Sequence, residues 1–283
     1  MTQNHTNATM DTAPTVRSRD GAAIPYLSMG DGPSVLVIPG ALSMAADYAD
    51  FARALAEHFT VHVIERRGRG GGSPQGDDYS IAKERDDVLA LQEKTGASFL
   101  VGHSFGGLVA LETARDNRAL TKIAVYEPGV SIDRSIPMDW MPGYEKKLAK
   151  GKYSDAFVEF TRGTGPARAR KAPRWLMKIL LRFFFSSHER RQMFGLLPEN
   201  LREHREVARL DSSYENYREI PAGVLLMYGG KSDSTWVDTA MERLAAVLPH
   251  SETKEFPTLD HFGIDKKAPG EVAAAVSEYF LTL

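Results

Sequence analysis

Apolar residues along the chain follow two alternating patterns. Short runs rich in β-branched residues are typical of strands buried on both faces of a parallel sheet. Longer segments with an apolar residue every three or four positions are typical of helices that cover such a sheet. This alternation predicts a doubly wound, mostly parallel α/β sheet. The strand-like runs are 34–38, 60–64, 98–101, 122–126, 222–228 and 252–256, and the helical segments are 45–58, 80–95, 105–115, 234–248 and 269–281.

Two parts of the chain depart from this alternation. Near the N-terminus, the turn signal Asp20-Gly21 lies between two strand-like segments and predicts a hairpin. From 130 to 216 the helical periodicity continues without a convincing strand. We interpret 130–216 as a helical cap inserted into a sheet domain that is formed by 15–129 and 217–283.

Composition excludes several classes of protein. The chain has 283 residues, of which 42% are hydrophobic and 25% charged, as in an ordinary globular protein. A formal net charge of −2 gives no reason to expect a nucleic-acid partner. The sequence contains no cysteine, which excludes disulfides, thiolate metal sites and a cysteine nucleophile. No other cluster of ligating residues stands out, so we expect neither a metal nor an organic cofactor.

The N-terminal segment 1–14 is polar and lacks the apolar core of a secretory signal. We expect it to be a disordered tail. No stretch approaches the roughly 18 continuous apolar residues of a membrane span. The sequence therefore favours a cytoplasmic protein without a stable membrane anchor, and it does not indicate an oligomeric state.

The strongest chemical signal is GHSFGG at 102–107, which contains G-x-S-x-G between a predicted strand and a predicted helix. A serine on such a sharp turn occupies a strained backbone conformation, and glycines on both sides let the neighbouring chain pass. The turn exposes the Ser104 hydroxyl at the carboxyl end of the sheet. It also directs the backbone N–H of Phe105, at a helix N-terminus, toward a developing oxyanion. We therefore predict that Ser104 is a nucleophile.

A serine nucleophile needs a base to take its proton. Of the eight histidines, His261 follows the last predicted strand in a loop near the C-terminus. This loop opens at the carboxyl end of the sheet, where Ser104 also lies. His103 is adjacent to Ser104 in sequence, but on such a turn its side chain points the wrong way. We predict that His261 is the general base.

These motifs together resemble the α/β-hydrolase superfamily. The resemblance covers nearly the whole chain after the tail, and it depends on GHSFGG, IPGALS, ERRGRGGGS, YGGKSD and LDHFG. It implies an α/β-hydrolase fold with a Ser–acid–His order of catalytic residues. These motifs are specific to the superfamily and not to one substrate.

The resemblance leaves two candidates for the acid that orients His261. In most of the superfamily the acid follows the strand after the cap, in a G-x-x-D turn, and Asp233 in 230–233 matches this pattern. Some members carry it after the strand before the cap, where Glu127 stands here. We predict Asp233 and keep Glu127 as the alternative. Asp260 is next to His261 in sequence and is not expected to reach its ring.

The resemblance also implies a second oxyanion donor in the loop after the first long strand. Many relatives have His-Gly there, whereas this chain has Pro39-Gly40-Ala41-Leu42. The donor is a backbone N–H, and we favour Ala41 over Leu42. The loop 65–73 resembles the D-x-R-G-x-G-x-S turn of the superfamily, with Glu65 at the acid position and one extra glycine. It matches neither a dinucleotide-binding motif nor a P-loop, and we interpret it as structural.

The cap contains a very apolar stretch, 175–185, within a basic region that has 13 Lys/Arg and four Asp/Glu between 144 and 191. The stretch fits a helix packed on the sheet domain, an apolar lid over Ser104, or a helix at a membrane surface. We expect Leu42, Trp175 and Phe184 to line a substrate pocket.

The sequence therefore predicts a serine hydrolase that forms an acyl-enzyme at Ser104. A small apolar ester is the expected substrate, and a lactone is the second class. On the same fold, the alternatives are a C–C bond hydrolase and a cofactor-free perhydrolase. Outside enzymes, the alternative is a non-catalytic, hydrolase-like binding protein.

Overall fold

The computed structural model describes residues 13–165, 167–232 and 234–282. Of the tail expected at 1–14, only the last two residues are among them, and Asp233 also lies outside the described residues. Within these ranges, no helix combines the length and the apolar character needed to cross a membrane.

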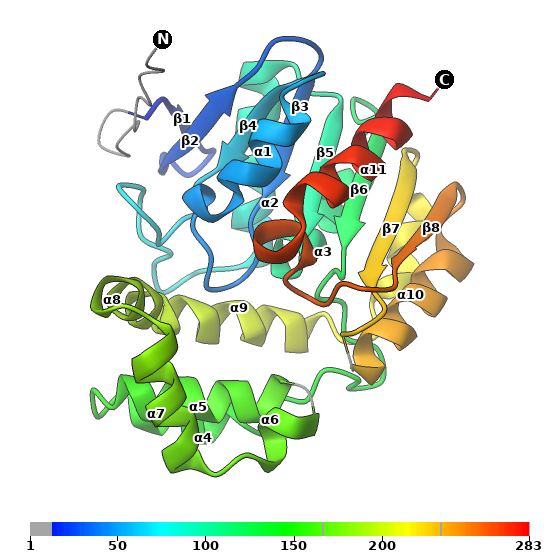
Figure 1. Cartoon of the computed structure of the whole chain (residues 1–283). Coiled ribbons are helices and arrows are strands. Elements are labelled where there is room, and N and C mark those ends of the chain that lie inside the picture. Colours follow the sequence, from blue (N-terminus) through cyan, green and yellow to red (C-terminus); the bar gives the residue numbers. More distant parts are fainter. Residues whose placement is uncertain (1–12, 166, 233, 283) are drawn as a thin grey trace, which may run out of the picture.

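The centre of the molecule is a sheet of eight strands in the order β1-β2-β4-β3-β5-β6-β7-β8 (Figure 1). β2 pairs antiparallel with β1 and with β4, and all other neighbouring strands are parallel. The predicted doubly wound, mostly parallel sheet is therefore confirmed. The strands are β1 (Thr15–Arg17), β2 (Ala23–Met29), β3 (Ser34–Ile38), β4 (Thr60–Ile64), β5 (Phe99–His103), β6 (Lys122–Tyr126), β7 (Gly223–Gly229) and β8 (Ser251–Phe256).

The central strands are buried on both faces, as their continuous apolar runs predict. In β3, Val35 and Val37 pack into one hydrophobic core, while Leu36 and Ile38 pack into another on the opposite face. Helices α1 and α11 cover the first of these cores, and α2, α3 and α10 cover the second. These helices are α1 (Ala49–Leu55), α2 (Ile81–Thr95), α3 (Phe105–Ala114), α10 (Thr235–Val247) and α11 (Pro269–Leu281).

Most element boundaries lie within one residue of the expectation, and two differ by more. The helix expected at 45–58 begins with a short 3₁₀ turn at 45–48 before α1. β5 continues to His103, because Gly102 and His103 pair with Val125 and Tyr126 of β6. Ser104 therefore follows the last residue of a strand directly.

Between β6 and β7 the long elements are helices, which together we call the cap. α9 lies between the sheet domain and the helices α4 to α7 (Figure 1). The cap has a small core of its own around Trp140, Tyr144 and Leu197. Its helices are α4 (Met141–Leu148), α5 (Tyr153–Thr164), α6 (Ala167–Lys171), α7 (Arg174–Phe184), α8 (Ser187–Gly195) and α9 (Leu197–Arg209).

Helix α3 packs against the end of β3 with almost no space between the two backbones. A Cβ atom on Gly106 would lie 2.2 Å from the carbonyl oxygen of Ile38. A Cβ atom on Gly102 would lie 2.5 Å from the carbonyl oxygen of Gly106. Real Cβ atoms do not come this close to backbone oxygens, so both positions require glycine.

We expect Gly106→Ala to reduce the free energy of unfolding by about 3 kcal/mol or more, because the added methyl group forces α3 away from β3. Gly270→Ala is the matched control. It lies in α11 with nothing within 4 Å of the added atom, so its effect should stay within about 1 kcal/mol. Urea unfolding of both variants measures the difference. If Gly106→Ala reduces the free energy of unfolding no more than Gly270→Ala does, α3 and β3 are not packed this closely.

Candidate active site

Ser104 stands on a strained turn between β5 and α3. Its backbone has φ 53° and ψ −120°, in the region that residues other than glycine rarely adopt. Its N–H donates to the carbonyl of Tyr126 over 3.0 Å, and its own carbonyl accepts from the N–H of Gly129 over 2.8 Å. The chain that leaves β6 thus holds the turn in place, and Ser104 lines a cavity at the carboxyl end of the sheet.

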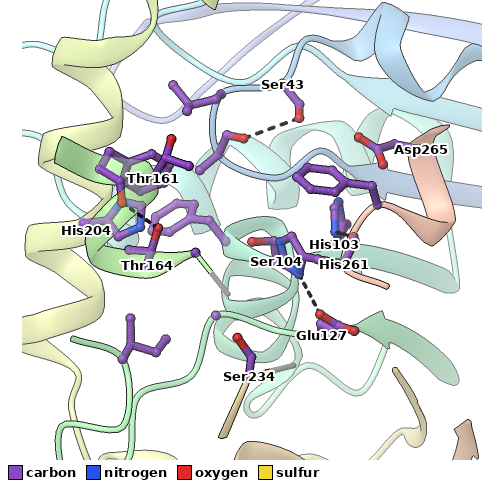
Figure 2. Close-up of a pocket in the computed structure, with 18 of the residues that line it drawn as sticks. Ser43, His103, Ser104, Glu127, Thr161, Thr164, His204, Ser234, His261 and Asp265 are labelled. Carbon is purple, nitrogen blue, oxygen red and sulfur yellow. Dashed lines mark hydrogen bonds and ion pairs between the residues drawn. The ribbon is translucent and has the colours of Figure 1, made fainter. Parts of the chain in front are cut away.

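His261 and Glu127 form a hydrogen-bonded pair beside this serine (Figure 2). Nδ1 of His261 lies 2.7 Å from Oε2 of Glu127. The Glu127 side chain is fully buried, whereas that of His261 is 29% exposed and faces the cavity. The other Glu127 oxygen, Oε1, accepts from the N–H of Gly229 over 2.9 Å and from the hydroxyl of Ser232. Three donors therefore surround one buried carboxylate.

This pair changes the acidity of the histidine. Burial by itself lowers the pKa of His261, but the hydrogen bond and the negative charge of Glu127 outweigh it and raise the pKa above its usual value. The charges of Asp265 and Asp260 act in the same direction. With Nδ1–H donated to Glu127, the Nε2 lone pair is left to accept a proton.

Of the two candidate acids, the described structure brings Glu127 to His261. Glu127 directly follows β6, which lies beside β5, the strand that ends just before Ser104. Its backbone has φ 42°, a left-handed value. Its N–H donates to the carbonyl of Met227 over 2.9 Å, next to the last pair of β6 and β7. The favoured candidate, Asp233, lies outside the described residues. Asp260 pairs with Lys267 instead of the imidazole of His261.

His103 was not expected to act as the base. It connects the loop after β3 to the loop of His261 through hydrogen bonds. Its Nδ1 lies 2.5 Å from the Tyr48 hydroxyl, and its Nε2 lies 2.9 Å from the carbonyl oxygen of His261. Burial and the neighbouring His261 hold the pKa of His103 well below its usual value, so the ring is neutral. The Tyr48 oxygen also accepts from the N–H of Gly40 over 2.9 Å. This chain of hydrogen bonds connects the loop after β3 to the backbone of His261.

The residues expected to form the oxyanion site, Phe105 and Ala41, line the same cavity as Ser104, together with Leu42. Behind the loop, the Arg66 guanidinium donates to the carbonyl of Gly40 over 3.2 Å. In a trans peptide group the C=O and the N–H point in opposite directions. Because the Gly40 carbonyl points to Arg66, the N–H of Ala41 points away from Arg66.

Arg66 also fastens the cap to the sheet domain. Its buried guanidinium forms two hydrogen bonds with Glu84 of α2, over 3.0 and 2.8 Å, and one with Glu203 of α9 over 2.9 Å. Arg69 reaches the same oxygen of Glu203 over 2.7 Å. The sequence motif at 65–73 was expected to be structural, and its arginines here connect three parts of the fold. Burial raises the pKa of Glu65, at the acid position of the motif, to about 7.

The cavity above Ser104 has a volume of about 350 Å³. Most of its wall is formed by apolar side chains, which come from both the sheet domain and the cap. The apolar side chains include Leu42, Ile136, Phe157, Phe160, Phe185, Met193, Val207 and Trp236.

A polar region lies on the cap side of this cavity, where Figure 2 shows Thr161, Thr164 and His204 across from Ser104. Both threonine hydroxyls donate to carbonyls one turn earlier in α5, over 2.9 and 3.0 Å. Nδ1 of His204 lies 2.9 Å from the carbonyl of Asn200, and burial lowers the pKa of His204, so its ring is neutral. The lone pairs of all three side chains can therefore accept hydrogen bonds from a ligand.

Two expected pocket residues lie elsewhere. Trp175 and Phe184 are largely exposed to solvent and do not line the cavity. The reason is the orientation of α7, which turns its buried side, around Leu181, toward the rest of the cap. Phe185, immediately after α7, is the residue of this stretch that reaches the cavity.

Several residues of the site were not identified from the sequence. Ser232 lies in the YGGKSD motif that was noted for Asp233, and Arg66 lies in the glycine-rich motif. Tyr48 and the polar cap residues gave no signal, because their roles depend on contacts across the fold. Among the described residues, no group of three or more histidine and acidic side chains is arranged to hold a metal ion.

A family model described as the alpha/beta hydrolase family matches residues 35–275. N-formylmaleamate deformylase of Pseudomonas putida is 30% identical over 119 residues, which are 40% of this chain and 44% of that protein. A pimeloyl-(acyl-carrier protein) methyl ester esterase of Proteus mirabilis is 29% identical over 132 residues, which are 44% of this chain and 49% of that protein. The chain thus spans less than half the length of these curated relatives.

Solved structures match over nearly the full chain. A crystal structure described as an alpha/beta hydrolase from Sphaerobacter thermophilus has a TM-score of 0.79 and 28% identity, and covers 94% of this chain and 100% of that chain. The N-formylmaleamic acid deformylase of Pseudomonas putida has a TM-score of 0.70 at 20% identity, and covers 94% of this chain and 99% of that chain. At that identity, the second likeness concerns the fold alone.

We expect Arg66→Met to reduce the free energy of unfolding by about 3–5 kcal/mol, because it leaves Glu84 and Glu203 as buried charges without this partner. Arg53→Met is the matched control. Its ion pair with Asp50 is on the surface, with side chains 70% and 72% exposed, so its loss should change stability by less than about 1 kcal/mol. Urea unfolding compares the two. A small effect of Arg66→Met would mean that the buried cluster does not hold cap and core together.

Proposed function

The chain belongs to the alpha/beta hydrolase family, and on that premise we propose that it is a serine hydrolase that cleaves carboxylic esters through an acyl-enzyme at Ser104. The observation that carries this proposal is the hydrogen bond between His261 and the buried Glu127, 2.7 Å long, at the cavity that Ser104 lines on its strained turn. A nucleophile, a base and an acid that orients the base are the groups that acyl transfer to water requires.

In the proposed mechanism, Ser104 attacks the ester carbonyl and its proton passes to Nε2 of His261. Glu127 keeps the proton of the imidazole on Nδ1 and stabilises the imidazolium that forms. His261 then donates its new proton to the leaving alcohol. In the second half, His261 takes a proton from water, which attacks the acyl-enzyme. His261 then returns this proton to Oγ of Ser104 as the acyl–oxygen bond breaks and the acid leaves. Glu127 takes the role for which the sequence favoured Asp233.

The backbone N–H groups of Phe105 and Ala41 are the proposed donors to the tetrahedral oxyanion. The position of Phe105 at the N-terminus of α3 supports its role, because free N–H groups and the helix dipole stabilise negative charge there. The bond from Arg66 to the Gly40 carbonyl supports the role of Ala41. By fixing and polarising this peptide group from behind, Arg66 acts as a positioning residue for the oxyanion site.

The lining of the cavity favours a substrate whose acyl or alcohol group is apolar and carries one hydrogen-bond donor at the end remote from the ester. Aromatic and aliphatic side chains form most of the wall, whereas Thr161, Thr164 and His204 provide acceptors across from Ser104. An ester whose remote end bears a hydroxyl group satisfies both features. The two curated relatives include a methyl ester esterase and a deformylase, so formyl amides belong in the same substrate panel.

Two measurements test the nucleophile. A fluorophosphonate probe followed by peptide mass spectrometry should label Ser104, and Ser104→Ala should abolish both labelling and ester hydrolysis.

The substrate class is tested with a series of esters. p-Nitrophenyl esters of increasing chain length should be cleaved with rising kcat/KM until the cavity is full, since binding energy grows by roughly 25 cal/mol per Å² of buried apolar area. Turnover of lactones, C–C bonds or peroxide but not esters would overturn the ester assignment. Labelling without any turnover would favour a binding protein.

The acid is tested by a pH–rate profile. Only neutral His261 acts as a base, so kcat/KM should rise with pH through the pKa of His261. Glu127 raises that pKa. Glu127→Gln should therefore move the rising limb to lower pH, while the plateau falls by roughly 10⁴-fold, the scale known for a serine protease that lost its triad carboxylate.

Asp233→Asn is the matched control for this profile, and it should leave both the limb and the plateau nearly unchanged. If Asp233→Asn produces the large loss and Glu127→Gln does not, the acid is Asp233 and the assignment is reversed.

A further inference from the structure

Helix α7 presents an apolar surface to solvent. Trp175, Phe183 and Phe184 are 65%, 81% and 76% exposed, and Ile179 and Leu180 are each 42% exposed. Trp175, Ile179 and Phe183 recur at intervals of four residues, and so do Leu180 and Phe184. They therefore form two adjacent stripes on one side of the helix. We call these five side chains the apolar patch. Exposed apolar surface of this kind usually marks an interaction site.

Basic residues are frequent in the segment that contains the apolar patch. The segment 170–191 has seven Lys/Arg and one acidic residue, Glu189. Lys178 and Arg182 lie one turn apart on α7 and line an open groove together with Lys152 and Arg190. Lys178 also pairs with Asp155 over 2.6 Å, but cations still predominate around the groove.

This arrangement decides which occupant fits. A second copy of the chain would bring two cationic surfaces together, which is unfavourable. An anionic lipid surface matches both parts, because aromatic and aliphatic side chains enter the boundary between headgroups and acyl chains while Lys and Arg contact the phosphates. We propose that the apolar patch docks the protein reversibly on an anionic lipid surface.

Along the chain, the apolar patch ends next to a residue of the wall of the catalytic cavity. Phe184 belongs to the apolar patch, and its neighbour Phe185 lines the cavity above Ser104. A protein docked through α7 thus places this wall next to the lipid surface. This location suits acyl substrates that partition into lipid, although docking itself does not depend on the proposed esterase activity.

The test uses the full chain carrying Ser104→Ala, so that no lipid is hydrolysed. Sedimentation with vesicles of equal parts phosphatidylcholine and phosphatidylglycerol measures binding, and pure phosphatidylcholine vesicles are the comparison. We expect binding to the anionic vesicles that weakens with added salt. We also expect a blue shift of the Trp175 fluorescence that Trp175→Phe removes.

Two sets of variants separate the contributions. The double variant Phe183→Ser, Phe184→Ser should reduce binding at least 10-fold. Arg182 and Arg191 are two exposed basic residues of the segment 170–191, and Arg182→Gln with Arg191→Gln should reduce binding several-fold. Leu281→Ser is the matched control, because Leu281 is an exposed apolar residue, 54% exposed, on α11. It should bind as the parent does. The replaced side chains are exposed, so the variants should keep the parental melting temperature.

Three results would overturn the proposal. The first is no binding to the anionic vesicles, and the second is equal binding by the parent and the Phe183/Phe184 variant. The third is a dimer in analytical ultracentrifugation that this variant abolishes while vesicles remain unbound, which would assign the patch to a second copy. Because binding is measured without turnover, each of these results is independent of the ester assignment.

Discussion

A carboxylate without solvent contact must be surrounded by hydrogen-bond donors, and Glu127 meets this constraint at the carboxyl edge of the sheet. Its donors come from the end of β7, from the turn after β7 and from the loop after β8. The buried charge at the end of β6 therefore connects to the turn after β7 and to the loop after β8, which are far from it in sequence. The position of His261, and with it the geometry of the site, depends on this one group.

The same constraint organises the boundary between the sheet domain and the cap. Arg66 is buried with Glu84 on one side and Glu203 on the other, and its remaining donors reach backbone carbonyls of the loop after β3. The cap helix α9, the helix α2 and the proposed oxyanion loop thus share one cation. A movement of the cap that separates Glu203 from Arg66 would leave charges buried without compensation, so the network favours a fixed cap position.

The sequence predicted the fold well because the strands are buried on both faces and their apolar runs have few alternative interpretations. It also singled out Ser104 and His261, since each follows a strand that ends at the same edge. The choice between Glu127 and Asp233 was beyond it, because both follow strands at that edge and only the backbone geometry decides which reaches the imidazole. The expectation for Trp175 and Phe184 was wrong for a different reason. An apolar helix pattern shows that a face avoids water, but not whether protein covers it.

Three residues of the site, Leu42, Ser104 and Glu127, have left-handed backbone angles, with φ of 57°, 53° and 42°. Each such residue costs about 1–3 kcal/mol relative to a relaxed conformation. Other interactions in the fold must offset this cost for the protein to keep these three backbone conformations. Glycine adopts such angles without a steric penalty, so the larger side chains at these three positions lower the stability of the fold.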